Sequence, residues 1–111
     1  MNSIFNRCSE LVYLNLSNYD TSNVTNMRHM FGGCYSLKEI KGLDKFNTSK
    51  VKNMNSMFQF CRELKLDLSN FDTSNVNFMI NMLHGCKKLK RINGLNNFNT
   101  SNVKDMGRMF E

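Results

Sequence analysis

The chain has 111 residues, enough for one small domain. Its 41% of hydrophobic and 22% of charged residues are typical of a folded protein rather than a disordered one. The net charge is +6, no apolar run approaches the roughly 20 residues of a membrane helix, and the opening Met1-Asn2-Ser3 lacks the features of a signal peptide.

Four copies of one segment organise the whole chain. Each copy carries a valine, a cysteine and a leucine at matching positions, with a period of about 26 residues. The matching positions are Val24, Val51, Val76 and Val103 for the valine, and Cys8, Cys34, Cys61 and Cys86 for the cysteine. We therefore divide the chain into units at approximately 1–29, 30–56, 57–81 and 82–111.

The first part of each unit is predicted to be a β-strand. Leu11, Leu14 and Leu16 follow the LxxLxL pattern of leucine-rich-repeat strands. The second unit has one extra residue here, and its Gly42 is predicted to form a β-bulge, as is Gly94 in the fourth unit.

The second part of each unit is predicted to be an α-helix. Val24, Met27, Phe31 and Cys34 are spaced as one stripe of a helix, and the next two units repeat that stripe. An Asp/Asn-Thr-Ser triplet precedes each stripe and is predicted to cap the first turn. Gly32-Gly33 and Gly85 fall at the end of the expected helix, where a left-handed residue often terminates it.

These expectations define an α/β fold, a leucine-rich-repeat-like solenoid of four strand–helix repeats with a mainly parallel sheet. One unit buries too few apolar side chains to offset the entropy of ordering about 26 residues, so neighbouring units must stack. The chain opens and closes inside a repeat, which suggests a fragment of a longer array. Its uncapped ends are expected to favour self-association.

The repeat resembles that of BspA-like leucine-rich-repeat surface proteins, and more narrowly a repeat of unknown function in mycoplasma surface lipoproteins. The likeness rests on Met57-Phe58, Cys61, Leu64, the run from 66 to 76 (LDLSNFDTSNV) and Met79. The resemblance implies a solenoid within a larger cell-surface or secreted protein, with adhesion as the usual suggestion. It supplies no catalytic residue.

The residues that could carry chemistry have simpler explanations. Because the cysteines form a ladder on the expected outer helical layer, roughly 8–10 Å apart, they are predicted to be reduced and buried rather than paired or zinc-bound. The methionine pairs are predicted to pack in the core rather than bind a soft metal. His29 and His84 have no partners placed for a triad. We therefore expect no enzyme activity, catalytic residue, metal or cofactor.

The variable strand residues form the candidate binding face, predicted to be concave. These residues are Tyr13, Asn15, Lys38, Glu39, Lys41, Lys65, Asp67, Lys90, Arg91 and Asn93. The leading hypothesis is a non-enzymatic module that binds a protein or glycan. The alternatives are a polyanion-binding module that uses the basic residues of this face, and a purely structural spacer.

Overall fold

Two short parallel strands form where exposed and inward-facing side chains alternate along the chain. The computed structural model describes residues 1–89 and 92–111, and in it β1 (Tyr13–Asn15) pairs with β2 (Glu39–Lys41). Leu14 lies opposite Ile40 and both point toward the core, while the flanking residues of each strand are exposed. Farther along the same side, Asp67 and Asn93 form an isolated parallel bridge.

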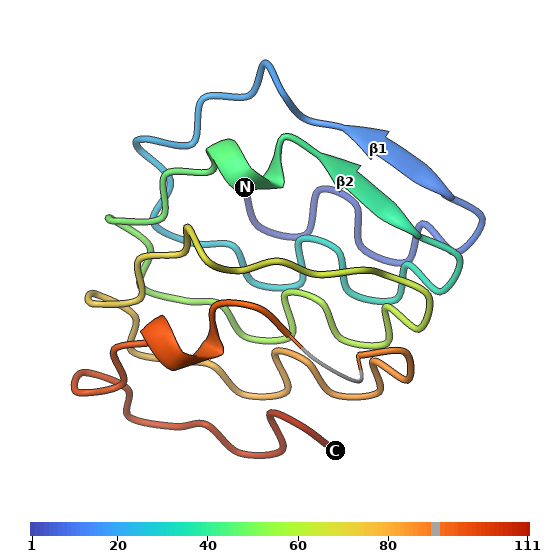
Figure 1. The fold of residues 1–111 in the computed structure, drawn as a ribbon. Coiled ribbons are helices and arrows are strands. Elements are labelled where there is room, and N and C mark those ends of the chain that lie inside the picture. Colours follow the sequence, from blue (N-terminus) through green and yellow to red (C-terminus); the bar gives the residue numbers. More distant parts are fainter. Residues whose placement is uncertain (90–91) are drawn as a thin grey trace.

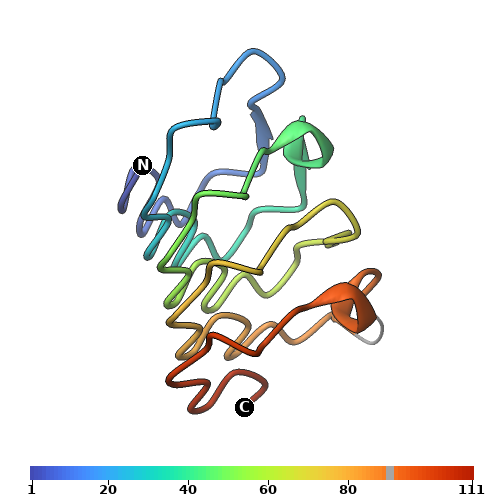
Figure 2. The same ribbon diagram turned by 90° about the vertical axis from the view of Figure 1, so that its left-hand side faces the viewer.

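Successive coils of the chain lie one on another (Figure 1). Each coil runs along the strand side, turns, and returns along an undulating edge, and the view from the side shows the coils as separate layers (Figure 2). Residues about 26 apart in the sequence are therefore direct neighbours. The repeat that the sequence displays is also the repeat of the structure.

The predicted α-helices are wrong. Among the described residues the only helical elements are two short 3₁₀ helices, η1 (Leu43–Lys45) and η2 (Leu95–Asn97). Tight turns occupy the segments expected to be helical. The expected α/β leucine-rich-repeat-like solenoid of four strand–helix repeats, with a mainly parallel sheet, is therefore contradicted, because within residues 1–89 and 92–111 the sheet has only the two strands β1 and β2.

Backbone hydrogen bonds explain why these segments do not form helices. Alternate amides donate to the neighbouring coil, and the amides between them donate three residues back within their own turn. The bonds between coils join Met27 to Asn53, His29 to Asn55 and Phe31 to Met57, each at 2.9 Å from nitrogen to oxygen. The turn bonds join Met30 to Met27, Gly32 to His29 and Cys34 to Phe31, each at 3.2 Å.

These hydrogen bonds recur every two residues, whereas the backbone conformation recurs every four, which is close to the 3.6 residues of an α-helical turn. Left-handed backbone recurs at the same interval, at His29 (φ 52°) and Gly33 (φ 76°), and again at Ser56 and Phe60. Over the eight residues from Met27 to Cys34 the two periods bury the same side chains. The apolar stripe was therefore sound as a prediction of burial and wrong as a prediction of helix.

The Asp/Asn-Thr-Ser triplets join coils instead of capping helices. The buried Thr48 hydroxyl donates to the carbonyl of Asp72 at 3.0 Å and accepts from the Asp72 amide at 2.8 Å. Thr21 and Thr73 make the same pair of bonds with the coil that follows each of them. The acidic or amide residue of the triplet accepts from the serine amide two positions on, as Asp72 does from Ser74.

Gly42 starts a 3₁₀ turn and is not part of a β-bulge. It has a left-handed φ of 88° and precedes η1, and Gly94 does the same before η2. A Cβ atom on Gly42 would lie 2.6 Å from the Cα atom of Ser17 in the neighbouring coil. The extra residue of this unit is thus accommodated in a turn that only glycine fits.

Stacked aromatic rings and methionines fill the interior. The Phe31 ring lies 5.8 Å from Phe5 and 5.5 Å from Phe58, with nearly parallel planes in both pairs. Met27, Met54 and other methionines on the stripe have no exposed area. Each apolar position of the repeat thus contributes one side chain per coil to a column in the core, as the repeat predicts.

Candidate functional site

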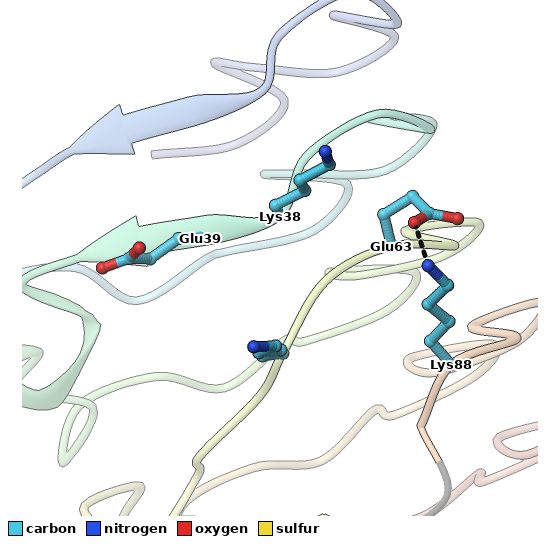
Figure 3. Close-up of a pocket in the computed structure, with 5 residues that line it drawn as sticks. Lys38, Glu39, Glu63 and Lys88 are labelled. Carbon is cyan, nitrogen blue, oxygen red and sulfur yellow. Dashed lines mark hydrogen bonds and ion pairs between the residues drawn. The ribbon is translucent and has the colours of Figure 1, made fainter.

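Side chains of three successive coils, next to β2 and on the same side of the molecule, surround a shallow hollow of about 490 Å³. We call it the charged hollow, and its lining residues are Lys38, Glu39, Glu63, Lys65 and Lys88 (Figure 3). Lys38 and Glu39 come from one coil, Glu63 and Lys65 from the next, and Lys88 from the one after. Because neighbouring coils stack in register, residues distant in sequence meet here. Three of the five, Lys38, Glu39 and Lys65, were predicted.

One ion pair crosses the charged hollow. The Lys88 ammonium donates to a carboxylate oxygen of Glu63, and Figure 3 shows the Glu39 carboxylate pointing away from this pair. Both partners are partly exposed, so the pair contributes little to stability. It neutralises one of the three lysines and leaves Lys38 and Lys65 beside a surface of mixed charge.

Glu63 and Lys88 were missing from the predicted site although the sequence contains their signal. Each lies two residues after a cysteine of the repeat, at Cys61 and Cys86. The repeat register therefore placed opposite charges at neighbouring positions. The prediction followed the leucine pattern of the strands and began too late in the unit to include them.

Two predicted binding residues are engaged in local turns. Asn15 accepts from the Ser17 amide at 3.0 Å, and Asp67 accepts from the amide of Ser69 at 2.9 Å. The Ser69 hydroxyl and amide hold the pKa of Asp67 below its ordinary value. Both side chains are exposed, so they can accept further bonds, but their orientation is fixed by the turn.

The remaining predicted residues lie on the same side of the molecule. Tyr13 (50% exposed) and Lys41 are on β1 and β2, and Asn93 is exposed beside Asp67. Lys90 and Arg91 lie outside the described residues. We call the set Tyr13, Asn15, Lys38, Glu39, Lys41, Lys65, Asp67 and Asn93 the strand face.

The cysteines form a ladder, but not on a helical layer. Because the coils bond directly, the helix-sized spacing that we used to separate the thiols does not apply. Cys34, Cys61 and Cys86 instead donate from Sγ to backbone carbonyls of the preceding coil, at 3.0–3.1 Å. Cys34 and Cys61 are buried, Cys86 is half-buried and Cys8 is exposed, so the expectation of burial fails at Cys8.

Burial also changes the chemistry of these thiols. It raises the pKa of Cys34 and of Cys86 to about 11, and it raises that of Cys61 further. A protonated thiol is a poor nucleophile, so these three side chains are unreactive at neutral pH.

The two histidines are less isolated than predicted. Both are half-buried, and the His84 ring packs edge-on against Phe60 at 5.1 Å between centroids. Burial, helped by the charges of Arg28 and Arg7, lowers the pKa of His29. His29 is therefore mainly neutral at pH 7.

Across residues 1–89 and 92–111, no three His, Cys, Asp or Glu side chains lie close enough to hold a metal ion together. The same residues include no helix that is long and apolar enough to cross a membrane. The charged hollow is a shallow surface that presents both ammonium donors and carboxylate acceptors.

Comparison with known proteins gives one match. A family model described as a Mycoplasma protein of unknown function, DUF285, matches residues 1–111. No curated protein and no solved structure matches the chain.

Proposed function

The chain belongs to the Mycoplasma protein family of unknown function DUF285, and we propose that it is a non-enzymatic interaction module of a cell-surface or secreted protein. In this proposal the strand face, together with the charged hollow, binds a protein or glycan partner. The finer likeness to BspA-like leucine-rich-repeat proteins, and adhesion as the biological role, belong to the same proposal. Self-association through the ends remains a separate prediction.

The observation that carries this proposal is the mixed charge of the charged hollow. Lys38 and Lys65 lie beside Glu39, and Lys88 is already paired with Glu63. A protein surface can present complementary groups to both charges, and electrostatic complementarity of this kind gives specificity. The hollow is open to solvent rather than enclosed, and each residue that lines it ends in a charged group, which favours a broad contact over a small molecule.

The polyanion alternative has less support from this geometry. A polyanion gains affinity from each unpaired cation that it contacts and is repelled by each carboxylate. In the charged hollow two carboxylates accompany three ammonium groups. The excess of one positive charge is small, although the whole chain carries +6.

Paired substitutions test the proposal. We expect Lys38→Ser with Lys65→Ser to weaken binding of proteins from a surface-protein extract of cultured animal cells at least tenfold at physiological salt. The matched control, Lys52→Ser with Lys104→Ser, removes the same charge from two exposed lysines outside the strand face. It should bind as the parent does. Surface plasmon resonance on the immobilised chain measures both.

Three outcomes would contradict the proposal. Equal losses in both double variants would mean that net charge, not the strand face, drives binding. Tight, salt-sensitive retention on heparin with no protein bound would favour the polyanion alternative, and no binding to either would favour a structural spacer.

A further inference from the structure

A second hollow lies at the undulating edge and shares no lining residue with the charged hollow. Its volume is about 240 Å³. We call it the corner hollow. Gly32 and Gly33 line it where they follow the turn at His29, and the neighbouring coils contribute Arg7 on one side and Phe60 on the other.

The lack of a side chain at Gly33 lets Arg7 of the preceding coil lie across this position. Arg7, Gly33, Phe60 and Gly85 occupy one register position in successive coils, and all four have left-handed backbone. Large residues thus alternate with glycines along this position. A Cβ atom on Gly33 would lie 3.3 Å from Cγ of Arg7, and one on Gly85 would overlap the Phe60 ring. Each large side chain leans over the glycine of the next coil.

Aromatic rings form one wall of the corner hollow. Tyr35 is 40% exposed, and its ring centroid lies 6.4 Å from that of Phe60. The Arg62 guanidinium covers the Tyr35 ring at 4.9 Å, which fixes the ring in place. A preorganised aromatic surface with exposed area is suited to contact with the apolar face of a ring-shaped ligand.

The polar lining carries a cation and no acid. Arg7 supplies a guanidinium, and neutral His29, Gln59 and Asn6 supply donors and acceptors. Among the residues that the structure describes, no Asp or Glu side chain lines the corner hollow. A guanidinium with five donors matches the two oxygens of a carboxylate. The lining therefore suits a ligand with hydroxyl groups and one negative charge.

From these observations we propose that the corner hollow binds a uronic-acid residue of a glycan. The sugar ring packs on the aromatic wall, its hydroxyl groups bond to the amide and imidazole side chains, and its carboxylate pairs with Arg7. The volume lies below the roughly 300–1,000 Å³ of pockets for drug-sized ligands, which suits a single ring. This site is independent of the proposed function of the strand face.

Binding of three small probes to the intact chain tests the proposal by NMR chemical-shift titration. D-glucuronate has both the ring and the carboxylate, D-glucose has only the ring, and acetate has only the carboxylate. We expect glucuronate to bind at least fivefold more tightly than either of the others. The shifts should centre on the amides of Gly32 and Gly33.

Matched variants separate the two contacts. Arg7→Gln should weaken glucuronate at least fivefold and leave glucose unchanged, whereas Tyr35→Ser should weaken both sugars. Arg28→Gln is the control, because Arg28 is exposed, does not line the corner hollow and carries the same charge. It should bind glucuronate as the parent does, and an unchanged unfolding midpoint in each variant confirms the fold.

Several results would overturn this proposal. Equal affinities for glucuronate and acetate would show that the site binds only the carboxylate and not the sugar ring. Equal affinities for glucuronate and glucose would exclude a role for Arg7. Equal losses in Arg7→Gln and Arg28→Gln would leave only general charge attraction, and an absence of shifts with all three probes would exclude the site. None of these results bears on the strand face, where the earlier lysine variants give a separate readout.

Discussion

At the residue scale, three buried threonines join neighbouring coils. Thr48 is 1% exposed and satisfies both the amide and the carbonyl of Asp72 with one hydroxyl group. Thr48→Val keeps the shape but leaves both backbone groups buried without a partner. Because each such group costs about 1–3 kcal/mol, we expect a loss of about 2 kcal/mol or more in the free energy of unfolding, measured with denaturant by circular dichroism.

Thr100 offers the matched control for this substitution. It holds the same position in its triplet but is exposed. Thr100→Val should change the free energy of unfolding by less than about 0.5 kcal/mol. Similar losses at both positions would mean that valine itself, and not the bonds to Asp72, causes the effect.

The buried thiols predict how stability depends on pH. Burial raises the pKa of Cys34 and Cys86 from the ordinary 9.0 to about 11. Between these values the unfolded chain loses thiol protons that the folded chain retains, so stability is complete below pH 9 and falls as the pH rises toward 11. Cys34→Ser with Cys86→Ser keeps a donor at each position without a thiol that titrates, and it should make this fall less steep in pH-dependent denaturant titrations, with Cys61 left to contribute.

Exposed Cys8→Ser is the control, because it removes a thiol that is not buried. Its stability should fall with pH as steeply as that of the parent. An unchanged slope in the double variant would show that groups other than these thiols determine the alkaline behaviour.

At the element scale, the turn before η1 depends on Gly42. Its φ of 88° and its close approach to Ser17 both exclude a side chain. Gly42→Ala should lower the free energy of unfolding by about 2 kcal/mol or more, because strain at the left-handed position adds to the contact with the neighbouring backbone. Thermal unfolding followed by circular dichroism measures this loss.

Gly107→Ala is the corresponding control. Gly107 is exposed, its φ lies outside the left-handed region, and an added Cβ atom would approach only the side chain of Asp105, at 3.2 Å. A change below about 1 kcal/mol is expected there. If Gly42→Ala were equally mild, the turn would have to adopt another conformation than the one described.

The elements also show where sequence reasoning succeeded and where it failed. The repeat correctly indicated which residues are neighbours and which are buried, because both follow from position within the unit. It could not distinguish the four-residue turn from a helix, because Met27, Phe31 and Cys34 face the core in either case. The sequence feature that argued against a helix was the paired Gly32-Gly33 within the stripe, because glycine disfavours a helix interior. The left-handed backbone at Ser56 and His29 is visible only in the structure.

At the scale of the whole molecule, stacking in register creates both hollows. The charged hollow was partly predictable, because Lys38, Glu39 and Lys65 lie on expected strands. The corner hollow was not, because it arises from Gly33 lying between Arg7 and Phe60, and that order is visible only once the register of the turns is known. The charged hollow therefore follows from the register of the repeat, whereas the corner hollow depends on a departure from it.

The central claim is that neighbouring coils bond directly through their backbones, and hydrogen-bond couplings measured by NMR test it most directly. The structure predicts a coupling between the Phe31 amide nitrogen and the Met57 carbonyl carbon, and equivalent couplings from Met27 to Asn53 and from His29 to Asn55. Couplings that instead join each of these amides to the carbonyl four residues earlier in the same segment would contradict the claim, because they would show the α-helices that the structure lacks.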